Sequence, residues 1–288
     1  MMNTQEIKII ECPRDAMQGL KNFVPTHQKI SYIQSLLSVG FDTIDFGSFV
    51  SPKAIPQMSD TAEVLRGLDL SSTQSKLLAI VANERGADTA VGFPEIRYLG
   101  YPFSISENFQ MRNTHKTIAE SIHVLDYIQN QCVKNGKELV LYISMGFGNP
   151  YGDPWNEAVV EEWVSMMTEK DIHIISLSDT VGTADAKVVE RLFSHLIPNY
   201  PLVEFGAHFH TSPLEWHAKV DSAYQAGCRR FDGAIRGYGG CPMAKDELVG
   251  NMPTEKLISY FQKEKAITHL NLLAFESSYN EALKIFSV

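Results

Sequence analysis

Eight short apolar segments, separated by amphipathic ones, constrain the fold of this 288-residue chain more than any other feature. Each segment is almost continuously apolar, which is typical of strands buried on both faces of a parallel sheet. The segments are residues 7–12, 43–49, 76–83, 96–104, 138–148, 173–180, 203–210 and 229–237. Together they predict a series of parallel strand–helix–strand units.

The stretches between these strands show helical periodicity. Residues 27–40 place Ile30, Ile33 and Leu36 on one face and end at Gly40, which we expect to be a C-cap. Further helices are predicted at residues 113–136, 156–170, 185–197, 215–227 and 254–266.

Eight such units favour an α/β fold, a closed (β/α)8 TIM barrel with extra C-terminal helices. The alternative is an open doubly wound sheet. The segment ECPRDAMQG after the first strand, however, is not the G-x-G-x-x-G fingerprint of a dinucleotide-binding sheet. We therefore expect a single domain over residues 1–288, with the barrel at about 7–266 and a helical extension at about 267–288.

Composition limits the classes of function. A hydrophobic content of 44% suits a globular core, and a formal net charge of -9 argues against a basic face for nucleic acid. No run reaches the ~18 apolar residues of a membrane span, and the N-terminus does not resemble a secretory signal, so we expect a cytoplasmic protein that does not bind membranes. The four cysteines form no C-x-x-C pair, which argues against a zinc knuckle or a disulfide scaffold.

Polar side chains gather where the predicted strands end. In a TIM barrel the active site lies at these carboxyl ends, so we take the polar residues there as candidate site residues. In chain order they are Arg14, Asp15, Gln18, Asp45, Ser48, Ser176, Asp179, His208, His210, Cys241 and Asn251.

The pair His208 and His210 is the strongest local clue. Residues two apart on a strand point to the same side, so both imidazoles could bind one divalent ion. The alternative is that they are hydrogen-bonded structural histidines. Asp15 and Asn251 could likewise be helix caps. Taken together, the four residues supply two nitrogens and two oxygens, a mixed set that suits Mg²⁺, Mn²⁺ or Zn²⁺.

Cys241 lies in the glycine-flanked loop GYGGCP. It could be a small residue in a turn. It could also be a thiol that moves protons once a mobile loop covers the barrel mouth.

Five segments carry a family resemblance: ECPRDAMQ, SFVSPKAIPQM, ISLSDTVG, AHFH and GGCPMAKDELVGN. In this order they resemble the 3-hydroxy-3-methylglutaryl-CoA (HMG-CoA) lyases, within the superfamily of metal-dependent lyases and Claisen synthases that share a TIM barrel. The likeness extends from Ile7 to about Phe261. It implies a lyase that uses a divalent cation (Mg²⁺ or Mn²⁺, with Zn²⁺ possible) to cleave HMG-CoA into acetyl-CoA and acetoacetate. It also implies a homodimer with an acyl-CoA substrate, in a pathway such as leucine degradation.

The resemblance implies a role for each site residue. Asp15, His208, His210 and Asn251 would be the metal ligands. Arg14 would bind the thioester carbonyl and stabilise its enolate, and Cys241 would be the catalytic thiol. His208 would also be a candidate base, and Asp45 occupies the place of a family glutamate near the arginine. The pocket would be lined by Gln18, Ser48, Ser176 and Asp179.

Departures from the family pattern leave the acyl group open. Cys12 stands where the family has glycine, Asp45 is one methylene shorter than its glutamate, and Thr211 replaces the aspartate after the histidines. The alternatives are a related lyase or aldolase for another 3-hydroxyacyl-CoA or 2-oxo acid, and a Claisen synthase, although such enzymes usually carry a further C-terminal domain. A barrel that binds metal or acyl-CoA without turnover is the non-enzyme alternative.

Overall fold

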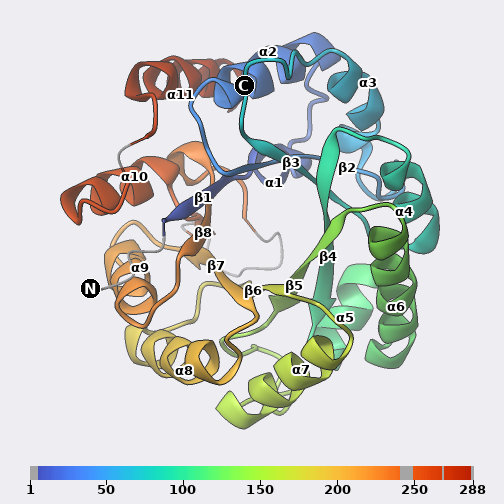
Figure 1. Ribbon diagram of the computed structural model, residues 1–288, viewed down its shortest axis with the longest axis vertical. Coiled ribbons are helices and arrows are strands. Elements are labelled where there is room, and N and C mark those ends of the chain that lie inside the picture. Colours follow the sequence, from blue (N-terminus) through green and yellow to red (C-terminus); the bar gives the residue numbers. More distant parts are fainter. Residues whose placement is uncertain (1–5, 241–248, 268, 287–288) are drawn as a thin grey trace.

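The computed structural model describes residues 6–240, 249–267 and 269–286, and it confirms the predicted barrel. Eight strands lie side by side, each parallel to its neighbours, and β1 pairs with β8 to close the ring (Figure 1). The strands are β1 (Lys8–Glu11), β2 (Thr43–Ser48), β3 (Lys76–Ile80), β4 (Ile96–Ser104), β5 (Glu138–Ser144), β6 (Ile174–Asp179), β7 (Glu204–Thr211) and β8 (Arg230–Gly233). A short strand β9 (Gly250–Asn251) adds to β7 in the antiparallel direction.

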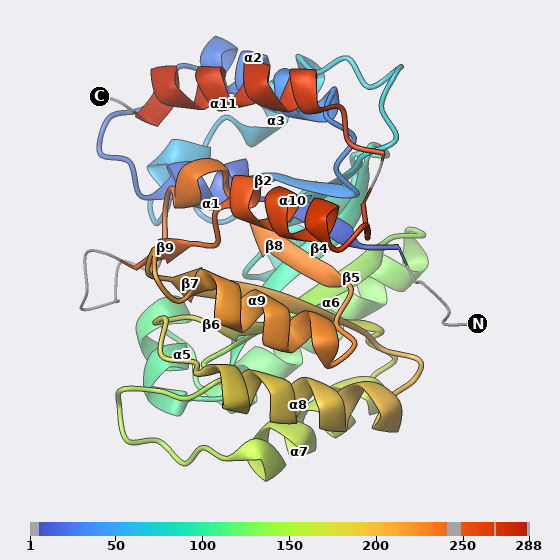
Figure 2. The same ribbon diagram turned by 90° about the vertical axis from the view of Figure 1, so that its left-hand side faces the viewer.

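Helices surround the barrel (Figures 1 and 2). They are α1 (Pro13–Gln18), α2 (Thr26–Leu37), α3 (Thr61–Arg66), α4 (Glu84–Val91), α5 (Glu107–Thr114), α6 (Ile118–Lys134), α7 (Glu157–Glu169), α8 (Ala186–Asn199), α9 (Trp216–Gln225), α10 (Thr254–Lys263) and α11 (Leu272–Phe286), with 3-10 turns η1 (Pro56–Met58) and η2 (Ile235–Gly237). The last helix, α11, lies against α2. Its Phe286 ring meets Tyr32 edge-on, with 6.2 Å between the ring centroids.

Several predicted elements need correction. The helix predicted at 27–40 ends at Leu37, and its C-cap is Ser38, not Gly40. The helix predicted at 113–136 is two helices, because His115 adopts φ 56° at the end of α5 and Thr117 starts α6 with a capping box to Glu120. Strand β5 ends before Met145, whose φ is 61°. Strand β8 ends at Gly233, and the predicted continuation to residue 237 is the turn η2.

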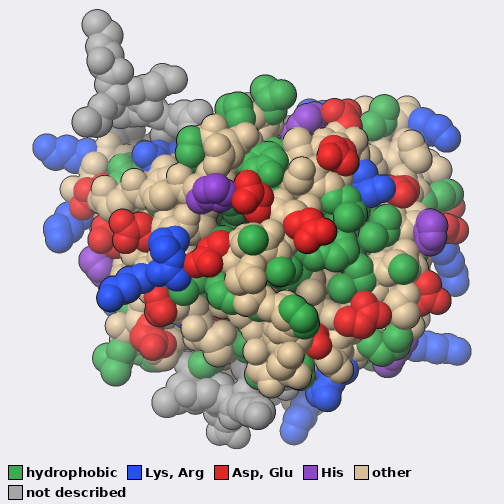
Figure 3. Space-filling model, turned by 90° about the horizontal axis from the view of Figure 1, so that it is seen from below, with side chains coloured by type: hydrophobic (Ala, Val, Ile, Leu, Met, Phe, Trp, Pro, Cys, Tyr) green, Lys and Arg blue, Asp and Glu red, His purple; other side chains and the backbone are tan. Residues whose placement is uncertain are grey.

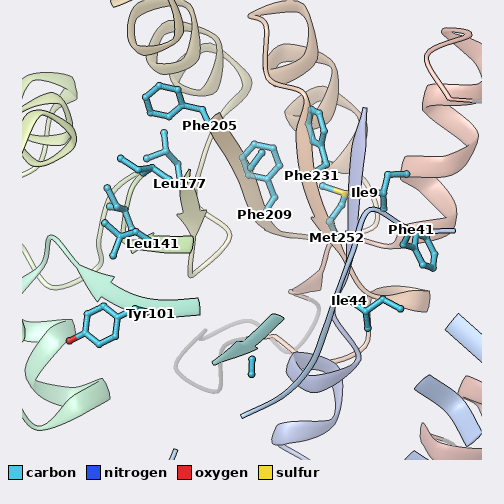
Figure 4. Close-up of a cluster of buried hydrophobic side chains, with 14 of the residues drawn as sticks. Ile9, Phe41, Ile44, Tyr101, Leu141, Leu177, Phe205, Phe209, Phe231 and Met252 are labelled. Atoms are coloured by element: carbon cyan, nitrogen blue, oxygen red, sulfur yellow. The ribbon is translucent and has the colours of Figure 1, made fainter. Parts of the chain in front are cut away.

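The alternation of side chains along the strands separates two regions of the interior. Outward side chains such as Leu177, Phe209 and Phe231 fill the main core between strands and helices (Figure 4). Inward apolar residues, among them Leu78, Val140 and Tyr142, form a second cluster inside the barrel. Towards the carboxyl ends of the strands the inward residues become polar, and the candidate site lies there.

The surface shows no charge segregation on the face seen in Figure 3, where acidic and basic side chains are interspersed with apolar ones. Among the described residues, no helix has the length and apolar character needed to cross a membrane.

Candidate metal centre and active site

Asp15, His208 and His210 converge at the carboxyl end of the barrel. Each offers one ligand atom, and these atoms all lie within 4.8 Å of one another, which is close enough for one ion. Asp15 comes from α1, directly after β1, and the two histidines occupy alternate inward positions of β7. The period of two along a strand thus brings the H-x-H pair together with the aspartate.

Hydrogen bonds orient both imidazoles. The Nδ1 atom of His210 lies 2.7 Å from the carbonyl oxygen of Thr180. A carbonyl can only accept, so Nδ1 carries the proton and Nε2 presents a lone pair. This Nε2 atom is buried and has no hydrogen-bond partner among the described residues. The Nδ1 atom of His208 lies 3.0 Å from Oδ2 of Asp232, the carboxylate–histidine arrangement that commonly supports a metal ligand.

The protonation states of Asp15 and His210 suit a cation, whereas the raised pKa of His208 favours its charged form, so an ion would have to displace a proton from that ring. Burial would raise the pKa of Asp15, but the Arg14 guanidinium, the two nearby imidazoles and the hydrogen bond from Asn251 together outweigh burial and lower this pKa to about 2. Burial and the neighbouring His208 lower the pKa of His210, so its ring is neutral at pH 7. For His208, burial opposes protonation, but the Asp232 carboxylate prevails and raises the pKa. An ionised carboxylate and a neutral imidazole are the forms that bind metal ions.

Asn251 lies beside this cluster. It pairs with His210 across β9 and β7, and its Nδ2 atom donates to Oδ2 of Asp15 at 2.7 Å and to the carbonyl of Tyr238 at 2.9 Å. The backbone packs closely here. A side chain at Gly239, where φ is +81°, would lie 2.8 Å from the carbonyl of Asp15.

Arg14 connects the cluster to Asp45. Its Nη2 atom lies 2.6 Å from Oδ2 of Asp45, and its Nη1 atom lies 3.0 Å from Oδ1 of Asp15 and 2.8 Å from Oε1 of Gln18. Burial raises the pKa of Asp45 to about 6 although Arg14 opposes the shift. Burial lowers the pKa of Arg14, but the adjacent carboxylates of Asp45 and Asp15 raise it by more, so the guanidinium stays charged.

The other sequence candidates are placed differently. Ser48 is buried, and its hydroxyl accepts from the backbone N–H of Val50. The Ser176 hydroxyl is buried without a hydrogen-bond partner in the described part of the chain. Asp179 does not join the cluster, because it shares the outward side of β6 with Leu177 and pairs with Lys219 of α9 at 2.7 Å. Cys241 falls outside the described residues.

Sequence reasoning missed three residues of this region. Asp232 orients His208, but nothing in RRFDGA marks it as facing a histidine of the neighbouring strand β7. The ring of Tyr142 packs edge-on to His208, with 5.7 Å between centroids, and its hydroxyl is buried without a partner in the described chain. Lys219 was detectable, because it falls among Val220 and Ala223 on the buried face of α9, where an unpaired ammonium would be unfavourable.

Comparisons with known proteins show to which family the chain is related. The model of the HMGL-like family matches residues 6–280. The chain is 31% identical to a hydroxymethylglutaryl-CoA lyase of Bacillus subtilis over 90% of this chain and 86% of that protein. It is 32% identical to the mitochondrial hydroxymethylglutaryl-CoA lyase of Bos taurus over 88% of this chain and 78% of that protein.

Solved structures of HMG-CoA lyases have the same fold as this chain. The fold matches an HMG-CoA lyase of Acinetobacter baumannii in complex with coenzyme A and 3-methylmalate, with a TM-score of 0.89, 31% identity, and coverage of 100% of this chain and 93% of that one. It also matches the HMG-CoA lyase of Brucella melitensis, with a TM-score of 0.91, 27% identity, and coverage of 99% and 100%. Because the family model matches almost the whole length of the chain, the chain belongs to the HMGL-like family.

Proposed function

We propose that this chain is a carbon–carbon lyase that cleaves HMG-CoA into acetyl-CoA and acetoacetate with the help of a divalent cation. One observation carries the proposal. The cluster of Asp15, His208 and His210 is linked through Asp15 to the buried guanidinium of Arg14, in a chain about 31% identical to known HMG-CoA lyases. A retro-Claisen cleavage needs both features, a site for a Lewis acid and a fixed positive charge.

The residues fit a divalent cation. The free Nε2 atom of His210, the ring of His208 and the ionised Asp15 would be ligands. Asn251 would add its amide oxygen once the amide turns, because its Nδ2 atom faces Asp15 in this structure. Bound there, the ion would lower the pKa of the substrate hydroxyl and bind its oxygen. The donor set suits Mg²⁺ or Mn²⁺, and Zn²⁺ would also accept it.

Arg14 would bind the thioester oxygen. Negative charge develops on that oxygen as the carbon–carbon bond breaks and the acetyl-CoA enolate forms, and a guanidinium held in place needs no reorganisation to stabilise it. Asp45 and Gln18 hold Arg14 by hydrogen bonds at 2.6 and 2.8 Å, so its direction is set before substrate arrives.

Two proton transfers complete the reaction. A base removes the hydroxyl proton, and an acid returns a proton to the enolate carbon. Asp45, with a pKa of about 6, exchanges protons near neutral pH, and His208 is a second candidate. Cys241 is proposed as the thiol that protonates the enolate. Gln18, Ser48 and Ser176 are proposed to line the pocket. For Asp179 we propose a structural role outside the pocket, because it pairs with Lys219 and accepts from the backbone N–H of Thr183.

A second candidate substrate is another 3-hydroxyacyl-CoA. Two residues favour it. Tyr142 lies beside His208, and its buried hydroxyl lacks a hydrogen-bond partner in the described part of the chain. Cys12 is buried near Asp45 and Asp232. Both side chains take up space at the inner end of the site and would restrict the acyl group. The proposed setting is a cytoplasmic homodimer in a pathway such as leucine degradation.

A substrate panel tests the proposal. The purified protein with added Mg²⁺ or Mn²⁺ is given HMG-CoA or one of several other 3-hydroxyacyl-CoA thioesters, and release of acetyl-CoA is measured for each. We expect the highest kcat/KM with HMG-CoA. A higher kcat/KM with another thioester would favour the second candidate, and no acetyl-CoA from any of them would contradict the lyase assignment.

A further inference from the structure

Lys219 is a buried cation on α9, outside the cluster described above. Its side chain is almost completely inaccessible, at 2% exposure. The Nζ atom lies 2.7 Å from Oδ2 of Asp179, 3.1 Å from the carbonyl of Gly182 and 3.0 Å from the carbonyl of His210. An ammonium has three N–H donors, and the structure provides one acceptor for each.

Two sets of hydrogen bonds link Lys219 to His210. The first is direct, because the backbone carbonyl of His210 is one of the acceptors of Lys219. The second passes through the turn after β6. Asp179 accepts N–H bonds from Thr183 at 2.8 Å and Ala184 at 3.1 Å, which folds this turn around its carboxylate. The same turn includes Thr180, whose carbonyl binds Nδ1 of the His210 ring.

We propose that Lys219 is a positioning residue for the metal centre. It holds the backbone of His210 and, through Asp179 and the turn 179–184, the carbonyl that sets the orientation and tautomer of its ring. A ligand held in this way loses less freedom on binding an ion, so Lys219 raises the affinity of the centre for a divalent cation. This inference rests on the metal centre of the proposed function.

A second buried lysine provides a matched control. Lys29 of α2 is 2% exposed, and its Nζ atom lies 2.6 Å from Oδ1 of Asp60 and also contacts the carbonyl of Gln57. It resembles Lys219 in burial, in its aspartate partner and in its carbonyl contact. The structure records no contact between Lys29 and Asp15, His208 or His210 among the described residues.

The experiment compares Lys219→Met with Lys29→Met. Both substitutions keep an unbranched side chain, shorten it by one atom and remove its charge, so both lower the melting temperature. The dissociation constants for Mn²⁺ and Co²⁺ are measured by calorimetry, without substrate and at a temperature where circular dichroism shows a folded protein. We expect Lys219→Met to weaken binding by about 10–100-fold, the range typical of residues that support a ligand, and Lys29→Met by less than about twofold.

Further readouts separate positioning from simple destabilisation. The visible absorption of bound Co²⁺ reports ligand geometry and should change in Lys219→Met but not in Lys29→Met. Lys219→Arg, which keeps the charge and the donors, should recover part of the affinity. If Lys219→Met does not fold, Lys219→Gln replaces it, with a smaller loss expected in the same direction.

The outcomes distinguish this inference from the proposed function. An unchanged metal affinity in the folded Lys219 variant, or an equal loss in both lysine variants, would overturn the positioning role alone. Wild-type protein that binds metal but releases no acetyl-CoA from HMG-CoA would contradict the proposed function alone. Wild-type protein that binds no divalent ion would overturn both.

Discussion

Arg14 and Asp45 form a buried ion pair, with the Nη2 atom of the arginine 2.6 Å from Oδ2 of the aspartate. Arg14 also contacts Asp15, a candidate metal ligand, at 3.0 Å. One guanidinium therefore joins a carboxylate that titrates near pH 6 to a carboxylate that stays ionised. The site can hold a fixed positive charge and an exchangeable proton within one network, as an enolate-forming reaction requires.

Replacement of Arg14 by lysine should separate charge from geometry. Lysine keeps one positive charge but cannot form the paired contacts with Asp45 and the link to Asp15 together. We expect Arg14→Lys to remain folded and to lose about 10²–10³-fold in kcat, the cost typical of removing one donor to a developing oxyanion. Steady-state kinetics with HMG-CoA, beside a melting curve, tests this. Wild-type kcat in the variant would remove Arg14 from the mechanism.

Asp232→Asn should weaken the metal centre through His208. The amide cannot match the charged acceptor that the carboxylate offers to Nδ1. Metal affinity measured by calorimetry should fall by about 10–100-fold. Glu161→Gln is the control, since Glu161 and His195 form a similar pair, 2.9 Å apart, on the surface. Equal affinities in the two variants would show that Asp232 has no such role.

The hydroxyl of Tyr142 should be dispensable for stability. It is buried without a hydrogen-bond partner in the described chain, whereas the hydroxyl of Tyr101 donates to the carbonyl of Ser121 at 3.2 Å. Tyr142→Phe should therefore raise the free energy of unfolding by about 1 kcal/mol, and Tyr101→Phe should lower it by about the same amount. Chemical denaturation of both variants measures this. If the Tyr142 hydroxyl binds substrate, the KM of the Tyr142→Phe variant for HMG-CoA also rises. A loss of stability in Tyr142→Phe would contradict the unpaired hydroxyl.

Glu11 should make stability depend on pH. Burial raises its pKa to about 8, although hydrogen bonds from Thr254 and the backbone N–H of Ile235 oppose the shift. In the unfolded chain a glutamate titrates near pH 4.5. Between these values the folded protein binds the extra proton, so the contribution of Glu11 to the free energy of unfolding is greatest below about pH 4.5 and decreases up to about pH 8.

The corresponding measurement compares wild type with Glu11→Gln from pH 5 to 8. The unfolding free energy of the wild type should fall by a few kcal/mol relative to that of the variant as pH rises, because only the wild type has a buried group that titrates in this range. Parallel curves for the two proteins would show that Glu11 titrates at its ordinary pH.

Much of the fold could be predicted because its signals are local. Strands buried on both faces need continuous apolar runs, and eight of them in alternation with helices leave few architectures. The H-x-H pair was equally readable, since the strand period brings His208 and His210 to one side. The sequence predicts one helix at 113–136 because the periodicity continues through His115. The left-handed backbone of His115 and the capping box at Thr117 separate α5 from α6.

The partners of the site residues were less predictable, because they depend on contacts distant in sequence. Asp179 and Asp232 both end or nearly end a strand, yet Asp232 points inward to His208 and Asp179 points outward to Lys219. Because side chains alternate along a strand, a shift of one residue decides whether a carboxylate faces the site or the helices outside the barrel. Composition and spacing do not contain that information; the pairing of β6, β7 and β8 does.

The central claim is metal-dependent cleavage of HMG-CoA, and acetoacetate formation by metal-stripped protein tests it most directly. The protein is treated with EDTA, exchanged into metal-free buffer, and assayed for acetoacetate as Mg²⁺ or Mn²⁺ is added back. Asp15→Asn, with a neutral amide in place of the ionised ligand, is assayed in parallel. We expect no acetoacetate from the stripped protein, a saturable rise with added metal, and at most a weak response in Asp15→Asn. Full activity in the stripped protein, or no acetoacetate at saturating metal, would contradict the claim.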